Sequence, residues 1–267
     1  MKICSIVSGS SGNCVFVTNG QTRILIDAGG SGKKIEEGLD SIGENIKDID
    51  ALLVTHEHSD HIQGVGILAR RHGIQIFATK GTINAMLNGR KNIGKVDESI
   101  INRIRPDAPF FVGDIMITPF SVSHDAAEPV AYCFKSGKER IGMATDLGFY
   151  DDYIVKNLLN SEVLYLEANH DIAMLEAGSY PFQLKERIKG PKGHLSNDAC
   201  AELLVRLCNE SRHKIKDVII AHLSEENNFP ELAYETVNAE LKTRLTKDRR
   251  PELHVAPRYS PSFMAET

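Results

Sequence analysis

The sequence predicts an α/β fold in which two β-sheets pack face to face and helices cover both outer faces. Strand-like apolar runs come first in each half of the chain and helical stretches follow them, so the same order occurs twice. No linker or change in composition divides the 267 residues. Residues 1–267 are therefore expected to form a single domain.

Short apolar runs bounded by Gly, Ser or Asp predict the strands. The run at 51–54 is apolar throughout, as in a buried strand, whereas 114–120 alternates as in a half-buried one. Between the first two strands lies a Ser/Gly-rich loop, 8–13, which suits either a tight turn or the approach of backbone N–H groups to an anion. The predicted strands are 2–7, 14–18, 22–27, 51–54, 75–78, 114–120, 130–134, 140–146, 163–167, 217–221 and 253–255.

Apolar residues that recur every three or four positions predict the helices. Ser196 is a suitable N-cap for one of them, because its hydroxyl can accept from a backbone N–H in the first turn. The predicted helices are 33–42, 62–71, 81–87, 151–159, 181–188, 198–209 and 231–245.

Side chains suited to metal binding follow the strand at 51–54 within six residues. Imidazole and carboxylate groups together suit zinc, manganese or iron. His56 and His58 lie two apart, so on extended backbone they project to the same side. Asp60 and His61 are adjacent and must diverge, which favours a second ion for them.

Other strands also end in residues that can bind a metal. Asp27 and Asp146 end their strands, and His124 follows the strand at 114–120. Asp27 could instead cap a following helix. Because open α/β folds place their sites where strands end, these side chains are expected to meet at one edge.

The spacing His-x-His-x-Asp-His at 56–61 resembles the signature of the metallo-β-lactamase-fold hydrolases. Asp27, His124, Asp146 and His222 occur in the order of that superfamily's other motifs, so the resemblance covers the whole chain. It implies an αββα sandwich of two mixed sheets flanked by helices. It also implies that Asp27 does not bind the metal itself but orients the metal ligands. The implied ligands are His56, His58 and His124 for one ion, Asp60, His61 and His222 for a second, and Asp146 as a bridge between them.

The same resemblance implies a hydrolase that uses two divalent ions, Zn²⁺ or Mn²⁺, with Fe²⁺ also compatible. Two such ions can share a hydroxide that attacks carbon or phosphorus, and Asp60 is expected to serve in catalysis as well as binding. Activity should fall in acid, because the ligands must be neutral imidazoles and ionised carboxylates. The lactamases proper carry Cys where Asp146 stands, which disfavours β-lactam hydrolysis.

Four further motifs resemble the YycJ/WalJ/VicX group, bacterial proteins of this fold associated with DNA exonuclease activity. They are Ser-Ser-Gly-Asn-Cys at 10–14, Glu-Ala-Asn-His-Asp at 167–171, Gly-His-Leu-Ser-Asn at 193–197 and His-Leu-Ser-Glu-Glu-Asn at 222–227. The implied activity is 5′→3′ DNA exonuclease, with RNA left open as substrate. His194 could protonate a leaving oxygen. The residues expected to bind phosphate are Ser11, Asn13, Asn169, His170, His194 and Ser196.

The charge pattern bears on the substrate. With a net charge of −5, the chain has no global attraction to nucleic acid, so a polyanion needs a local basic patch. Lys185, Arg187, Lys189 and Lys192 supply one. The alternative is a solvated helix face, because Glu186 interrupts the stretch.

Two other functions remain open at this stage: a thioester or lactone hydrolase of the glyoxalase II type, and a regulatory protein of a two-component system. The five cysteines form no C-x-x-C pair, which favours reduced thiols and the cytoplasm. No signal peptide is apparent, and no run approaches the roughly 20 apolar residues of a membrane span. A homodimer is neither indicated nor excluded.

Overall fold

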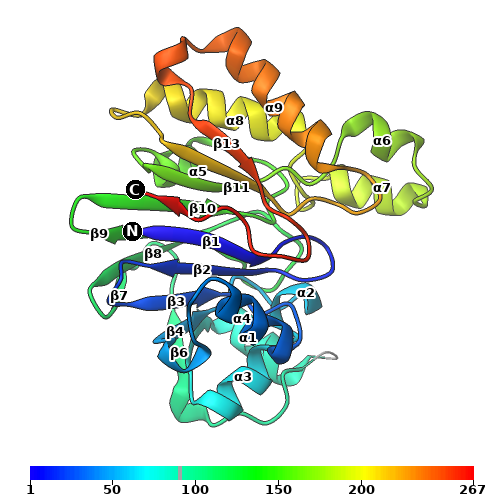
Figure 1. The fold of residues 1–267 in the computed structure, drawn as a ribbon. Coiled ribbons are helices and arrows are strands. Elements are labelled where there is room, and N and C mark those ends of the chain that lie inside the picture. Colours follow the sequence, from blue (N-terminus) through cyan, green and yellow to red (C-terminus); the bar gives the residue numbers. More distant parts are fainter. Residues whose placement is uncertain (90–91) are drawn as a thin grey trace.

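The computed structural model describes residues 1–89 and 92–267 and contains two seven-stranded sheets packed face to face, with helices outside (Figure 1). Both sheets contain parallel and antiparallel pairs, which confirms the predicted αββα sandwich of mixed sheets. In spatial order, the first sheet contains β14 (Ala265–Glu266), β1 (Lys2–Val7), β2 (Cys14–Thr18), β3 (Arg23–Ile26), β4 (Ala51–Leu53), β5 (Gln75–Thr79) and β6 (Ile101–Ile104). The second contains β13 (Glu252–Val255), β12 (Asp217–Ala221), β11 (Val163–Glu167), β10 (Glu139–Ala144), β9 (Val130–Ser136), β8 (Ile115–Ser121) and β7 (Phe110–Val112).

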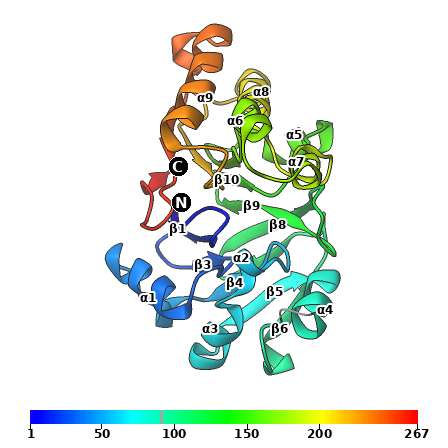
Figure 2. The ribbon, with the colours of Figure 1, turned by 90° about the vertical axis from the view of Figure 1, so that its right-hand side faces the viewer.

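The helices divide between the two outer faces and the edge where the polar strand ends meet (Figures 1 and 2). The first sheet is covered by α1 (Gly32–Ser41), α3 (Val65–His72) and α4 (Lys80–Asn88), and the second by α5 (Asp152–Leu158), α8 (Asn197–Glu210) and α9 (Pro230–Arg244). At the edge lie α2 (Ser59–Ile62), α6 (Ile172–Ala177) and α7 (Phe182–Lys189). The short 3-10 helices are Ile46–Asp48, Glu98–Ile100 and Lys247–Arg249.

Three apolar layers follow from the alternation of side chains along each strand. In β3, Ile24 and Ile26 pack between the sheets, whereas Leu25 packs against the helices of the first sheet. In β12, Ile219 faces the inter-sheet layer and Ile220 faces the helices of the second sheet. Strands covered on both faces need apolar residues at every position, which explains the uninterrupted apolar runs in the sequence.

Besides the three 3-10 helices, four elements were not predicted from the sequence: β6, β7, β14 and α6. They are two to six residues long and most of their positions are exposed or half-exposed, so they are too short and too little buried to give a clear periodic pattern. The predicted helix 62–71 is also two helices, α2 and α3, separated at Gly64. The Gly64 N–H donates to Ala28 O at 2.6 Å, and a Cβ there would lie 2.6 Å from Gly30 O.

The five cysteines are free and buried, in agreement with their expected role as small apolar side chains. Within the residues that the structure describes, no helix has the length and apolar character needed to cross a bilayer.

Gly29 joins three segments at the edge that carries the polar strand ends. Its N–H donates to Asn13 O at 2.8 Å, and a Cβ on it would lie 1.6 Å from Asp60 O. Gly29→Ala should therefore destabilise the fold by about 1–3 kcal/mol or more through overpacking, seen as a lower urea midpoint. Gly30→Ala is the matched control, because its Cβ would make only ordinary contacts of 3.8 and 3.9 Å with flexible side chains. Equal midpoints for the two variants would contradict this account.

Candidate metal centre

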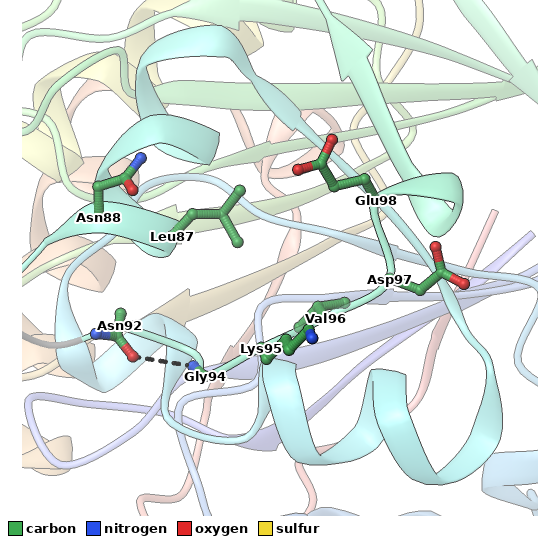
Figure 3. A pocket seen from close by; sticks show the side chains of 8 residues that line it. All are labelled: Leu87, Asn88, Asn92, Gly94, Lys95, Val96, Asp97 and Glu98. Atoms are coloured by element: carbon green, nitrogen blue, oxygen red, sulfur yellow. Dashed lines mark hydrogen bonds between the residues drawn. The ribbon is translucent and has the colours of Figure 1, made fainter.

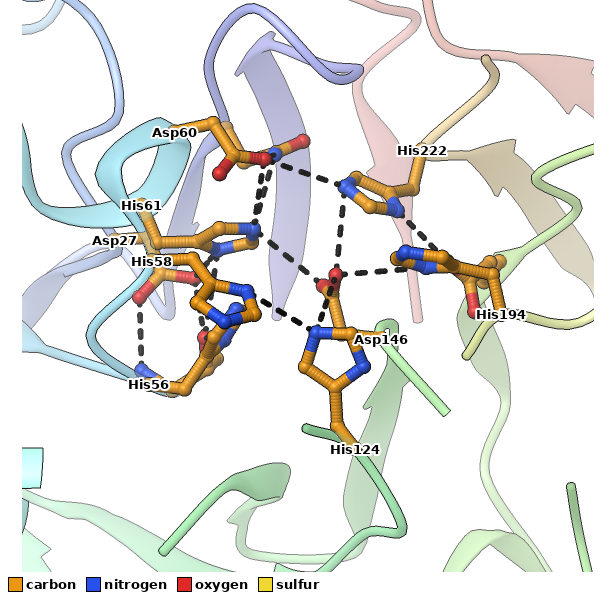
Figure 4. A network of polar contacts seen from close by, with 12 residues as sticks. Asp27, His56, His58, Asp60, His61, His124, Asp146, His194 and His222 are labelled. Atoms are coloured by element: carbon orange, nitrogen blue, oxygen red, sulfur yellow. Dashed lines mark hydrogen bonds and ion pairs between the residues drawn. The ribbon is translucent and has the colours of Figure 1, made fainter. Parts of the chain in front are cut away.

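The side chains expected to bind metal meet at one edge of the sandwich (Figure 4). They come from the segment after β4, the loop after β8 and the ends of β10 and β12, so both sheets contribute. Among the described residues, ligand-type atoms form four overlapping groups, each with its atoms within 4.8 Å of one another. The groups are His56, His58 and His124; Asp60, His61 and His222; His56, His61 and Asp146; and Asp146, Glu167, His194 and His222.

The first group consists of three imidazoles. His124 Nε2 lies 3.2 Å from His58 Nδ1, and the His56 ring centroid lies 4.6 Å from that of His58 and 4.9 Å from that of His124. Burial, reinforced by the neighbouring His61, holds the pKa of His56 well below its ordinary value. His56 is therefore neutral, as a metal ligand must be.

Asp146 lies between this group and the second. Its Oδ1 is 3.8 Å from His124 Nε2 and 3.5 Å from His222 Nε2, and its Oδ2 is 3.5 Å from His61 Nε2. Burial opposes ionisation of Asp146, but the charges of His222 and His61 outweigh it and lower the pKa of the carboxyl. Asp60 completes the second group, 3.5 Å from His61 Nε2 and 3.8 Å from His222 Nε2.

Unpaired buried atoms show that these residues fit a divalent cation. His56 Nε2, Asp146 Oδ2 and His222 Nε2 are buried and have no hydrogen-bond partner among residues 1–89 and 92–267. Buried polar atoms normally have a partner, and a metal ion is one that imidazole and carboxylate both accept. The carboxylate charge also calls for a cation: Asp146 and Asp60 overcome burial and raise the pKa of His222 to about 10.

Asp27 lies behind His61, on the side away from the other ligand groups. Its Oδ2 is 2.7 Å from His61 Nδ1, and it accepts from the Thr55 N–H and the Thr55 hydroxyl, both at 2.8 Å. The Thr55 hydroxyl lies 2.9 Å from His56 Nδ1. These contacts orient two imidazoles so that their Nε2 atoms face the centre.

Glu167, at the end of β11, contacts histidine Nδ1 atoms in the second sheet as Asp27 does in the first. This role of Glu167 was not predicted from the sequence. Its Oε1 accepts from His194 Nδ1 and His222 Nδ1, each at 2.7 Å, and its Oε2 accepts from the N–H groups of Leu147 and Leu195 at 3.2 and 3.1 Å. Burial opposes its ionisation, but His194 and His222 outweigh burial and lower the pKa of the carboxyl. The sequence did contain a signal for this role, because a glutamate ends an otherwise apolar strand and Glu is rarely buried without a partner.

Glu167→Gln should weaken metal binding by about 10–100-fold. All four groups around this carboxylate are donors, so the NH₂ of glutamine must face a donor and one contact is lost. Titration of metal-free protein against a competing chelator measures the affinity. Glu210→Gln is the control, because Glu210 is an exposed partner of Arg206 elsewhere on the surface. Unchanged affinity in Glu167→Gln would show that the carboxylate only fills space.

Three residues of the centre have left-handed backbone conformations. The φ angles are 61° at Asp27, 57° at Asp146 and 58° at His222. Each residue lies just beyond the end of its strand, at β3, β10 and β12. The conformation turns the chain sharply there, and it costs a residue with a Cβ roughly 1–2 kcal/mol.

The residues expected to bind phosphate do not all line the same cavity. Asn169 and His194 line the cavity beside the ligand groups, which has a volume of about 230 Å³. His170 and Ser196 line an adjoining hollow of about 220 Å³ on another side of His194. Asn13 is buried, with Nδ2 3.1 Å from His61 Nε2 and 3.4 Å from Asp60 Oδ2. Ser10 and Ser11 are both exposed, and Ser10 rather than Ser11 lines the cavity. The cavity is lined by Ser10, His58, Asp60, Asp146, Asn169, Tyr180, Leu184, Arg187, Ile188, His194, His222 and Ser224.

Two of the four cations in the basic stretch, Arg187 and Lys189, are paired with carboxylates. Lys189 Nζ lies 2.5 Å from Glu176 Oε1 and 2.9 Å from Glu186 Oε1. Arg187 Nε lies 2.5 Å from Asp125 Oδ2, and of the four predicted cations Arg187 alone lines the cavity. Lys189 is therefore a weaker candidate for phosphate binding than the sequence suggested.

A larger hollow lies elsewhere, at the end of α4 (Figure 3). Its volume is about 870 Å³, and its lining residues are Leu87, Asn88, Asn92, Gly94, Lys95, Val96, Asp97 and Glu98. None of these belongs to a ligand group found in the described part of the chain. The volume of a hollow alone therefore does not identify the metal centre of this protein.

Comparison with known proteins agrees with this geometry. Residues 22–215 match the family described as "Beta-lactamase superfamily domain". The chain is 42% identical over 236 residues to the "Exodeoxyribonuclease WalJ" of Streptococcus pneumoniae, covering 88% of this chain and 86% of that protein. It is 38% identical over 240 residues to the "Exodeoxyribonuclease YycJ" of Bacillus anthracis, covering 90% and 88%.

Solved structures share the fold at low identity. Zn²⁺-bound PqqB from Methylobacterium extorquens aligns with a TM-score of 0.74 and 16% identity over 100% of both chains. The metallo-β-lactamase-fold protein YhfI from Bacillus subtilis aligns with a TM-score of 0.70 and 17% identity over 99% of both. These likenesses support the architecture alone.

Proposed function

Because the chain belongs to the metallo-β-lactamase superfamily and is a metal-dependent hydrolase of that fold, we propose that it is a 5′→3′ exodeoxyribonuclease. One observation carries the proposal: the chain aligns over nearly its whole length with two proteins that are named exodeoxyribonucleases. The competing activities have less support. No observation favours a thioester substrate, and the ligand groups argue against a purely regulatory role.

The proposal includes two divalent ions, Zn²⁺ or Mn²⁺, with Fe²⁺ compatible with the same ligands. Its basis is Asp146, which contacts members of both histidine groups, so the set is suited to two ions rather than one. When bound, the ions would supply a deprotonated water as nucleophile and stabilise charge on the phosphate. Asp60 lies at the cavity surface, where it can bind an ion and orient the nucleophile.

His194 is the proposed proton donor to the leaving oxygen. Its Nδ1 is held by Glu167 at 2.7 Å, and the structure gives its Nε2 no hydrogen bond within the described residues, so Nε2 remains for the substrate. The carboxylate of Glu167 fixes the orientation of the ring, so that Nε2 points away from this contact. Asn169 is the proposed phosphate ligand beside it, since it lines the same cavity.

The test uses metal-free protein to which Mn²⁺, Zn²⁺ or Mg²⁺ is returned. Three substrates are offered to each preparation: 5′-labelled duplex DNA, RNA of the same sequence, and S-lactoylglutathione. The expected result is progressive loss of nucleotides from the 5′ end of DNA. Cleavage of the thioester with no cleavage of either nucleic acid would overturn the proposal.

A further inference from the structure

One side of the metal cavity consists of a segment that the metal centre itself does not need. Tyr180, Leu184, Arg187 and Ile188 line the cavity, and we call them the α7 wall. No residue of α7 is buried, and α6 and α7 stand at the side of the main body (Figures 1 and 2). α7 therefore contributes little to the core, while three of its residues line the cavity.

The α7 wall combines apolar surface with one cation. Leu184 and Ile188 are four residues apart on α7, so they lie on one face, and Arg187 lies beside them. All the other lining residues are polar or charged: Ser10, His58, Asp60, Asp146, Asn169, His194, His222 and Ser224. Apolar side chains add nothing to metal binding, so in this cavity they offer a surface suited to an apolar part of a substrate.

Arg187 is fixed but has unused donors. Its Nε is held by Asp125 Oδ2, while Asp125 Oδ1 lies 3.5 Å from His124 Nε2 and 3.8 Å from His58 Nε2. Within residues 1–89 and 92–267, the structure gives its two Nη groups no hydrogen bond. A guanidinium with two free Nη groups is suited to a phosphate.

The size of the cavity limits the ligand. A volume of about 230 Å³ lies below the roughly 300–1,000 Å³ usual for small-molecule sites. The cavity therefore suits one unpaired nucleotide rather than a stretch of duplex.

We propose that the α7 wall binds the nucleotide that flanks the scissile phosphate, an inference that rests on the proposed function. The base and sugar pack on Tyr180, Leu184 and Ile188. Arg187 binds the next phosphate of the strand. The wall thereby selects a nucleic-acid end over other phosphodiesters.

Small esters test the apolar part. Methyl p-nitrophenyl phosphate and the 5′- and 3′-(p-nitrophenyl phosphates) of thymidine share a leaving group and differ by a nucleoside. The wild-type protein should hydrolyse at least one thymidine ester with a higher kcat/KM than the methyl ester. Tyr180→Ala or Leu184→Ala should reduce that preference by about 10-fold. Phe182→Ala is the matched control, because Phe182 is on the same helix but does not line the cavity.

Salt dependence tests Arg187 with a single-stranded oligonucleotide. Arg187→Ala should raise KM about 10-fold and reduce the slope of log KM against log salt by about 0.7. Arg206→Ala should leave both unchanged, because Arg206 is likewise held by a carboxylate through Nε but lies on α8, outside the cavity. If wild-type protein cleaves DNA but shows no preference among the esters, the nuclease stands and the α7 wall inference is wrong. If it cleaves neither DNA nor any ester, both fail.

Discussion

Asp146→Ala should reduce turnover by more than about 10³-fold and lower the metal content from the proposed two equivalents to one or fewer. Asp146 contacts His61, His124 and His222, so its removal affects both histidine groups at once. It also removes a buried negative charge that offsets the charge of bound cations, and one such electrostatic contact is worth about 10²–10³-fold by itself. Elemental analysis of protein refilled with excess metal, together with kcat on DNA, measures both effects.

Asp146→Asn separates charge from position. The amide keeps an oxygen in place but loses the charge, so metal content and kcat should fall between those of the wild type and Asp146→Ala. A ceiling of one equivalent in the wild-type protein would remove the two-ion proposal. Near-normal turnover in Asp146→Ala would show that this carboxylate does not bind the reacting metal.

His194→Ala should lower kcat on DNA by roughly 10²–10³-fold while metal content stays unchanged. The reason is the proton that His194 is proposed to donate through Nε2 to a leaving oxygen of high basicity. A p-nitrophenyl ester releases a weakly basic oxygen that needs no proton. The loss on such an ester should therefore be much smaller than the loss on DNA.

This comparison separates proton donation from a structural role. If His194 only supports Glu167 and His222, the variant should lose metal and lose both activities equally. His72→Ala is the control, since His72 also contacts a carboxylate, that of Glu36 at 3.1 Å, but lies outside the cavity. Equal losses on DNA and ester with full metal content would contradict the assignment of His194 as proton donor.

The sequence could predict the strand ends, because apolar runs and the polar residues that follow them are local features. It could not predict the partner of each polar residue. Glu167 meets His222 because β11 and β12 pair in parallel with Glu167 opposite Ala221, a register set by contacts distant in sequence. The Lys189 charge was visible in the sequence, but the position of Glu176 against it depends on how α6 and α7 pack.

The loop before β2 shows that the sequence also could not predict which single residue reaches the cavity. A Ser/Gly-rich segment predicts a turn near the site, but which serine reaches the cavity depends on backbone angles. Gly9 has φ of 127°, and Ser10 rather than Ser11 lines the cavity. Composition places a loop within a residue or two, whereas contact with a substrate depends on a single position.

The left-handed residues at the strand ends have a consequence for evolution and engineering. Glycine would adopt φ near 60° at positions 27, 146 and 222 without the steric penalty, but it has no side chain to bind or orient a metal. Glycine there would relieve the backbone strain, but it would also remove the chemistry and the buried hydrogen bonds that Asp27 and His222 make. These three positions therefore keep a strained backbone because the side chains that the metal centre needs cannot be supplied by the residue that fits the backbone best.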